Sequence, residues 1–289
     1  MREWYDSRPK KEGVLGFVPT MGALHAGHRS LLEIARRECH LVVASIFVNP
    51  MQFGPSEDFS RYPRTFEADA AICAAAGVDA IFLPTSEAMY PQGFTTFVEV
   101  GGISKLWEGA ARPGHFRGVT TVVLKLFELV RPDIAYFGLK DYQQQLLIRR
   151  MVLDLNVPIQ IRSCAIVRES DGLAMSSRNR YLSEEERSRA VAISQALKFA
   201  REELTSGTSS LDAVRRGMIE TIEAAGLEVE YAAICDPLTL VELQDPENEM
   251  VLLVAARLGS VRLIDNMQVT LDEASLGGQH QQKKAESAR

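Results

Sequence analysis

Two histidines three residues apart could hold an anion early in this chain. His25 and His28 flank a glycine in the stretch PTMGALHAGH, residues 19–28, directly before an amphipathic run typical of a helix. If that helix begins near Gly27, the histidines lie beside unpaired main-chain N–H groups and the positive end of the helix dipole. Imidazole donors and a tightly turning glycine backbone can bind phosphate oxygens. The motif therefore predicts an anion site that suits a nucleoside triphosphate.

Other interpretations of this pair are weaker or less specific. An isolated HxxH pair more often only caps or lines the start of a helix. A catalytic zinc needs a third protein ligand, and His40, His115 and His280 have no acidic or thiol partner at ligand spacing. The chain also lacks the G-x-G-x-x-G fingerprint after its first predicted strand and the G-x-x-x-x-G-K-[ST] loop. Neither NAD binding nor a Walker-type ATPase is favoured.

Two further stretches carry neutral amides and a charged pair. Asn49 and Gln52 lie in FVNPMQFGPSEDFSRYPR, residues 47–64, and can bind hydroxyls or a carboxylate without adding a fixed charge. The stretch FGLKDYQQQ, residues 137–145, offers Lys140 as a point charge for phosphate and Gln144 as another amide. Asp141 in the same stretch could contact Mg²⁺ or a ribose. Taken alone, each stretch is better explained as an ordinary polar turn exposed to solvent.

A fourth stretch groups hydroxyls with a guanidinium. Ser176, Ser177 and Arg178 lie together in IVRESDGLAMSSRN, residues 166–179, which follows the last predicted core strand. Such a group could close on phosphates as a mobile clamp, although Ser-Ser-Arg by itself is common loop composition.

The elements that must position these residues alternate between strand and helix. Short apolar runs predict strands at residues 14–18, 41–47, 80–83, 134–138 and 159–167, and helical periodicity predicts helices at 27–39, 64–77, 116–130 and 142–155. Strands that are apolar throughout indicate a parallel sheet covered on both faces, a Rossmann-like doubly wound α/β core. Ligands bind such sheets at the carboxyl ends of the strands, where the motifs above lie.

The pattern changes after about residue 175. A long helix is predicted over 183–204, with Ser183 and Glu186 in capping-box spacing, and another over 209–226. Strands follow at 229–236, 250–258 and 261–267, which indicates a smaller α+β domain. We therefore expect a nucleotide-binding domain at 1–174, a C-terminal lid domain at 175–270 and a polar, disordered tail at 271–289.

Composition limits the partners. The 289 residues carry 32 basic and 38 acidic side chains, a net charge of −6, without the basic patch that nucleic acid or anionic lipid would require. Neither an N-terminal apolar signal nor a membrane-spanning run is present in the sequence. The four cysteines, none in a CxxC pair, fit a reducing compartment. We expect a cytoplasmic protein that binds small molecules, with no nucleic acid or membrane partner.

In their order and spacing, PTMGALHAGH, FVNPMQF, GLKDYQQ and RESDGLAMSSRN resemble the pantoate–β-alanine ligase family, within the HxGH nucleotidyltransferase-like superfamily. The resemblance covers nearly the whole chain. It implies a cytoplasmic, Mg²⁺-requiring homodimer that uses ATP to convert pantoate to pantoyl adenylate and pyrophosphate. The acyl group then passes to the amine of β-alanine, which releases AMP and pantothenate. One departure is a shorter lead before the first strand than the family usually has.

The resemblance also assigns roles to residues. It implies catalytic roles for His25, His28, Lys140 and Arg178, a pantoate or β-alanine site at Asn49, Gln52 and Gln144, and Mg²⁺ at Asp141. Residues 175–178 would act like the KMSKS loop of synthetases. The implied ATP site comprises Pro19, Thr20, Met21, Gly22, Ala23, Leu24, His25, Ala26, Gly27, His28, Gly138, Leu139, Lys140, Asp141, Val167, Met175, Ser176, Ser177 and Arg178.

Two functions of other classes remain open at this point. A nucleotidyltransferase would share the HxGH loop but transfer a nucleotide to a phosphorylated acceptor. It would be expected to have a basic pocket where this chain has Gln52 and Gln144. A non-catalytic nucleotide-binding protein would have no need for the complete set of charged and polar groups.

Overall fold

The computed structural model describes residues 13–55, 57–207 and 209–271. The chain divides into two compact units, Met1–Val167 and Arg168–Arg289. The boundary between the units therefore lies after Val167, earlier in the chain than the boundary expected after residue 174. The segment between the two positions folds back on itself as a short hairpin, in which Arg168 forms a β-bridge with Ala174. The hairpin therefore belongs with the second unit, together with Met175–Arg178.

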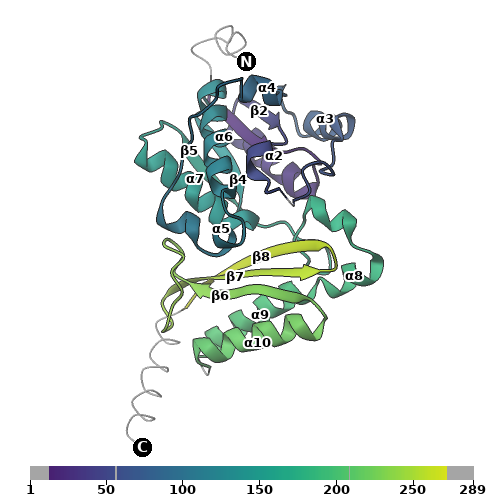
Figure 1. Cartoon of the computed structure of the whole chain (residues 1–289), viewed down its shortest axis with the longest axis vertical. Helices are drawn as coiled ribbons and strands as arrows, with labels where there is room; N and C mark the ends of the chain where they lie inside the picture. Colours follow the sequence, from purple (N-terminus) through teal and green to yellow (C-terminus); the bar gives the residue numbers. More distant parts are fainter. Residues whose placement is uncertain (1–12, 56, 208, 272–289) are drawn as a thin grey trace, which may run out of the picture. The chain divides into compact units, whose positions relative to one another are not determined.

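The first unit is built on a five-stranded parallel sheet (Figure 1). Its strands are β1 (Leu15–Thr20), β2 (Leu41–Ile46), β3 (Ala80–Phe82), β4 (Ile134–Gly138) and β5 (Gln160–Cys164), in the spatial order β3-β2-β1-β4-β5. The predicted doubly wound sheet is confirmed. The last strand ends at Cys164, so the final three residues of the predicted run 159–167 form part of the connection that follows.

Helices cover both faces of this sheet, which explains the uninterrupted apolar strands. Along β1, Leu15 and Phe17 join the core beneath α6 (His115–Val130) and α7 (Tyr142–Asp154). Val18 joins the core beneath α2 (Ala26–Glu38) and α3 (Phe66–Ala75) on the opposite face. All three side chains are fully buried. β1 is thus fixed from both sides, and with it the start of the loop that carries the two histidines.

Short helices between these elements were not predicted. They are α4 (Ser86–Met89), α5 (Trp107–Ala111) and the 3₁₀ turns η1 (Pro50–Gln52), η2 (Gly102–Lys105) and η3 (Leu139–Asp141). Three to five residues give too few turns for a helical repeat of apolar residues to stand out in a sequence. Two of these turns, η1 and η3, carry predicted site residues.

The second unit contains helices and a small sheet, as predicted, and the sheet is antiparallel. The sheet consists of β6 (Glu228–Cys235), β7 (Glu249–Leu258) and β8 (Val261–Thr270), and α10 (Leu211–Ala224) shares its core. The long helix expected over 183–204 was wrong in one respect: it is divided into α8 (Glu184–Arg189) and α9 (Ala192–Ser206). At the break the Ile193 N–H bonds the carbonyl of Ala190 three residues back, so the turn tightens. The predicted capping box of Ser183 and Glu186 begins α8.

The end of the described chain is packed. The side chain of Leu271 is 4% exposed and its N–H bonds the carbonyl of Asn248 at 2.8 Å. Leu271 was expected to begin the disordered tail; the rest of that stretch lies outside the described residues. Among the residues that the structure describes, no helix is both long and apolar enough to span a bilayer. All four cysteines are buried and free of disulfides.

Candidate active site

The two loops with the strongest motifs follow neighbouring strands. β1 and β4 pair in the centre of the sheet, where the chain winds outward in one direction through β2 and β3 and in the other through β5. The carboxyl ends of two such strands form the crevice in which doubly wound folds bind ligands. The positive charge of Lys140, which follows β4, acts on the ring of His28 in the first turn of α2. The structure therefore brings the first and third motifs together.

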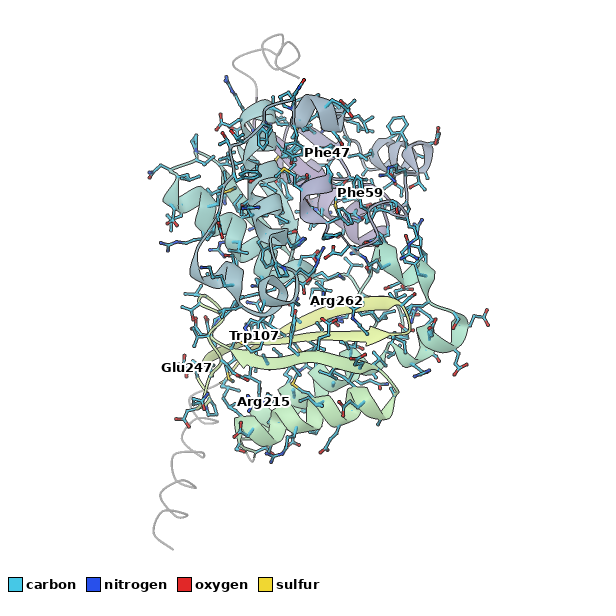
Figure 2. The ribbon with its side chains drawn as sticks, viewed as in Figure 1. Phe47, Phe59, Trp107, Arg215, Glu247 and Arg262 are labelled. Carbon is cyan, nitrogen blue, oxygen red and sulfur yellow. The ribbon has the colours of Figure 1, made fainter. Side chains whose placement is uncertain are left out.

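Hydrogen bonds also join the ends of β1 and β2. The N–H of Phe47 donates to the carbonyl of Thr20 at 3.0 Å, and the hydroxyl of Thr20 donates to the carbonyl of Ser45 at 2.7 Å. Phe47, labelled in Figure 2, is buried with its ring centroid 6.3 Å from that of Tyr90. These contacts hold the turn that carries Asn49 and Gln52 beside the histidine loop.

Main-chain donors assign the tautomers of both histidines. Nδ1 of His25, the N-cap of α2, accepts from the N–H of Gly27 at 3.1 Å, and Nδ1 of His28 accepts from the N–H of His25 at 3.3 Å. An unprotonated Nδ1 leaves the proton of each neutral ring on Nε2. The rings lie with centroids 4.1 Å apart. The capping expected of an isolated pair is thus present, and it leaves each ring with an Nε2–H donor.

His28 is neutral over the physiological range. Burial, followed by the nearby His25 and Lys140, lowers its pKa to about 3. A proton on this ring would be poorly solvated and repelled by two neighbours. His28 in the free protein is therefore a hydrogen-bond donor through Nε2–H and not a standing positive charge.

Asn49 fixes the turn after β2 with its whole side chain. The side chain, 1% exposed, donates from Nδ2 to the carbonyl of Gly118 at 3.1 Å and accepts at Oδ1 from the N–H of Met51 at 3.3 Å and the hydroxyl of Tyr90 at 2.8 Å. Because a carbonyl only accepts and an N–H only donates, this orientation is unambiguous. The remaining Nδ2 hydrogen bonds Oε1 of Gln52 at 3.0 Å. All four hydrogen-bonding positions of Asn49 are used inside the protein.

The orientation of Gln52 follows from that of Asn49. With Oε1 bound to Asn49, the amide nitrogen Nε2 points the other way, where it lies 3.3 Å from Sδ of Met21 in the histidine loop. Sulfur is a weak acceptor, so this contact competes little with a better one. Gln52 therefore offers a donor group beside the loop that follows β1.

A charged cluster that the sequence analysis did not identify binds the main-chain carbonyl of Gln52. The carbonyl of Gln52 accepts from Nδ1 of His115 at 2.8 Å and from Nη2 of Arg112 at 3.2 Å. Arg112 also binds Glu57, at 2.9 Å from Nε, and Glu108, at 3.3 Å from Nη1. Burial, followed by the charge of Arg112, lowers the pKa of His115 to about 4. The available signal was Arg-Pro-Gly-His at the start of a helix, of which the sequence analysis weighed only His115, as a possible zinc ligand.

Acidification is expected to destabilise the first unit through these two histidines. Both are neutral when folded and have an ordinary pKa near 6.5 when unfolded, so the unfolded state binds more protons below pH 6.5. The contribution of each histidine to the free energy of unfolding is therefore complete above pH 6.5. Below pH 6.5 it falls by about 1.4 kcal/mol per histidine for each pH unit. Going from pH 7 to pH 5 should lower the free energy of unfolding by about 4 kcal/mol.

Urea unfolding followed by tryptophan fluorescence measures this effect, because Trp107 belongs to the first unit and the second unit contains no tryptophan. His28→Gln removes one of the two titrating groups and should lose about half of the pH sensitivity. An unchanged pH dependence in that variant would contradict the assignment of a neutral His28.

The three consecutive glutamines after β4 differ in the hydrogen bonds of their side chains. Gln143 accepts from the N–H of Glu108 and donates to two main-chain carbonyls, and Gln145 donates to the hydroxyl of Ser163 at 2.6 Å. Both are buried. Gln144 is half-buried, and its side chain has no hydrogen-bond partner among the described residues. The amides of Gln143 and Gln145 are thus engaged inside the protein, and the substrate-binding role of Gln144, the glutamine that the motif indicated, stays a prediction.

Asp141 fits a magnesium ion that is held mainly by phosphate. Its exposed carboxylate caps no main-chain N–H at the start of α7. Within the described ranges of the chain, no three or more His, Cys, Asp or Glu side chains are grouped so that they could hold a metal ion. Mg²⁺ is commonly held by one or two carboxylates plus substrate phosphates, so a single carboxylate is compatible with such a site.

Residues 168–179 of the fourth motif lie in the second unit, where residues 175–178 are anchored on both sides. On the N-terminal side, Arg168 forms a two-pronged ion pair with the 4%-exposed side chain of Asp265, at 2.6 and 3.0 Å. On the C-terminal side, Nδ2 of Asn179 donates to the carbonyl of Ala174 at 3.1 Å. Residues 175–178 between these anchors are half-buried, and the hydroxyl of Ser176 caps the N–H of Arg178. Their approach to the loops of the first unit, and the role of Val167, stay predictions.

Comparison with known proteins agrees with the four motifs. Residues 1–268 match the family model described as pantoate-beta-alanine ligase. The chain belongs to the pantoate–β-alanine ligase family. A pantothenate synthetase of Moorella thermoacetica is 49% identical over 271 residues, covering 93% of this chain and 96% of that protein. Pantothenate synthetase 1 of Bradyrhizobium diazoefficiens is 53% identical over 257 residues, 88% of this chain and 89% of that protein.

Solved structures of the family share the fold. Pantothenate synthetase from Thermus thermophilus superposes with a TM-score of 0.88 at 50% identity, over 92% of this chain and 96% of that one. The ligase from Francisella tularensis, solved with "Beta-gamma ATP and Beta-alanine", gives 0.77 at 36% identity, over 92% and 93%. The predicted ligase family, enzyme class and fold are therefore confirmed, and the nucleotidyltransferase and non-catalytic alternatives are not favoured.

Proposed function

We propose that this ligase joins pantoate to β-alanine in two steps that consume one ATP. In the first, a carboxylate oxygen of pantoate attacks the α-phosphorus and pyrophosphate leaves, which gives pantoyl adenylate. In the second, the amine of β-alanine attacks the acyl carbon, the bond to the AMP oxygen breaks and the amine loses a proton. The observation that supports this scheme best is that the loops after β1, β2 and β4 each carry a hydrogen-bond donor at the carboxyl end of the sheet, namely His28, Gln52 and Lys140.

The first step requires stabilisation of charge more than covalent help from the protein. Negative charge grows on the α-phosphate and on the departing pyrophosphate, and preorganised donors lower the energy of that state. We assign this task to the Nε2–H groups of His25 and His28 and to the ammonium of Lys140, whose charge acts on the ring of His28. On the family resemblance alone, we also propose that Arg178 and the hydroxyls of Ser176 and Ser177 bind phosphate.

Neutral amides suit the pantoate site for a chemical reason. A lysine or arginine on the carboxylate would withdraw charge from the attacking oxygen, whereas an amide N–H orients the substrate with a smaller loss of nucleophilicity. Nε2 of Gln52 and the amide of Gln144, which has no partner within the described ranges, provide such contacts. Because the side chain of Asn49 is saturated, we infer that Asn49 contributes by orienting Gln52.

Three further parts of the proposal rest on the family resemblance. Mg²⁺, with Asp141 as its protein ligand, would neutralise charge on the ATP phosphates when bound. A homodimer and a cytoplasmic location are proposed on the same ground. Size-exclusion chromatography with light scattering tests whether the protein is a homodimer.

Pyrophosphate and AMP release tests the function itself. Purified protein with ATP and Mg²⁺ should give a pyrophosphate burst of about one equivalent when pantoate is added alone. Addition of β-alanine should then produce steady release of AMP and pantothenate. If pantoate elicits no pyrophosphate burst or exchange, the adenylate scheme is wrong for this chain.

Replacement of Gln144 by alanine is expected to weaken pantoate far more than ATP. The loss of an amide partner to a substrate group in a closed site weakens binding by about 1–3 kcal/mol. This corresponds to an increase of roughly 5- to 150-fold in the KM of pantoate. Arg149→Ala, an exposed residue of the same helix, is the matched control. Steady-state kinetics with each substrate varied in turn measures both constants, and equal weakening of pantoate and ATP would count against the assignment.

A further inference from the structure

A buried carboxylate from a different part of the chain holds the histidine loop. Asp69 lies in α3 and is 1% exposed. Its Oδ2 accepts from the N–H of Ala23 at 3.0 Å, and its Oδ1 accepts from the N–H of Leu24 at 2.8 Å and the hydroxyl of Thr65 at 3.2 Å. Each carboxylate oxygen thus binds a main-chain N–H of the loop between β1 and α2.

The loop needs such a restraint because its backbone is unfavourable. Gly22 has φ of +84° and Ala23 has φ of +50°, so two consecutive residues occupy the left-handed region. A residue with a side chain enters this region at a steric cost, and it stays there only where its surroundings impose it. The two hydrogen bonds to Asp69 act directly at and after Ala23. They allow the chain to reverse from β1 and present His25 as the N-cap of α2.

The environment of Asp69 favours a carboxylate over an amide. Two main-chain N–H groups converge on separate oxygens, and an amide has only one oxygen to offer. Asp69 also lies in the first turn of α3, where the helix dipole stabilises negative charge. An asparagine would place an NH₂ group against a main-chain donor in a site closed to water.

We propose that Asp69 is a positioning residue for adenylation: through the N–H groups of Ala23 and Leu24 it fixes the turn that sets His25 and His28 against the ATP phosphates. This proposal rests on the proposed function, since it assumes that the loop binds ATP. None of the four motifs includes Asp69. Its role predicts effects on ATP rather than on pantoate.

Asp69→Asn and Glu67→Gln form a matched pair for the test. Glu67 is an exposed acidic residue in the same first turn of α3, so its replacement removes the same charge without touching the loop. We expect Asp69→Asn to slow pantoate-dependent ATP–pyrophosphate exchange about 10- to 100-fold and to raise the KM of ATP, with the KM of pantoate within about twofold. Glu67→Gln should behave as the parent protein does.

Binding of a non-hydrolysable ATP analogue, measured by calorimetry, tests the positioning role of Asp69 separately from the proposed ligase function. If the parent protein catalyses no exchange but binds the analogue about tenfold more tightly than Asp69→Asn does, the proposed function fails while the positioning role stands. A variant that matches the parent protein in exchange and in analogue affinity would overturn the role of Asp69. The role of Asp69 would also be overturned if the exchange activity of Asp69→Asn fell only in proportion to its folded fraction, measured by thermal unfolding, while its KM values stayed unchanged.

If Asp69→Asn does not fold, Thr65→Val provides the test. It keeps the carboxylate and removes only the hydroxyl that orients Oδ1. Analogue affinity should fall about threefold at an unfolding temperature close to that of the parent protein. An unchanged affinity would contradict the proposal.

Discussion

Replacement of His28 by alanine is expected to lower the kcat of adenylation by about 100- to 1000-fold, the usual effect of losing one preorganised donor at a developing negative charge. The ring is held by the N–H of His25, and this bond directs the proton to Nε2. Because its pKa is about 3, His28 gives a neutral donor over the working range of pH. His28→Gln can present an amide N–H near the same place and should recover part of the lost rate.

Rapid-quench measurement of pyrophosphate release with ATP and pantoate isolates this step. The control is Arg29→Ala, the next residue of α2, which is exposed and pairs only with Glu33 in the described structure. The control should stay within about twofold of the parent protein. A His28→Ala variant that releases pyrophosphate at the parent rate would remove His28 from the mechanism.

Conversion of Gln52 to glutamate should raise the KM of pantoate by roughly 100-fold with a much smaller effect on ATP. The new side chain has the shape of glutamine but no donor. One of its oxygens would still face Nδ2 of Asn49, and the other would turn a negative charge toward a carboxylate substrate. The fixed orientation of Asn49 prevents the turn from adapting by an exchange of amide ends.

Gln160→Glu is the matched control, since Gln160 is exposed at the amino end of β5 and the change adds the same charge to the first unit. Initial rates at varied pantoate and varied ATP should differ from those of the parent protein only for Gln52→Glu. Parallel increases in both KM values for Gln52→Glu would argue that the turn had collapsed and not that a donor to pantoate was lost.

The sequence predicted the sheet well because both faces of its strands are buried. Continuous apolar runs such as LVVASIF are unmistakable when they lie between two layers of helices, and β2 differs from the prediction only by ending at Ile46. The break between α8 and α9 was missed for the opposite reason. Ala190 and Val191 are ordinary helix residues in the sequence, and the tightening depends on local packing that periodicity does not report.

Within the candidate site, the sequence identified residue types but not their partners. Asn49 and Gln52 were grouped as two substrate ligands, whereas the structure joins them in a chain of hydrogen bonds that leaves only Gln52 a donor to offer. Asp69 was hidden in a run taken as an amphipathic helix. Its position four residues before the buried Cys73, on the covered face of α3, was the available signal. Contacts across 45 residues of sequence have no local pattern.

Transfer of ¹⁸O from the carboxylate of pantoate tests the adenylate scheme most directly. With both carboxylate oxygens labelled, and ATP, Mg²⁺ and β-alanine present, mass spectrometry should find one ¹⁸O in the phosphate of AMP and the other in the amide of pantothenate. This result is expected because the attacking oxygen stays with phosphorus when the amine displaces AMP. Unlabelled AMP, or label in inorganic phosphate together with ADP, would contradict it.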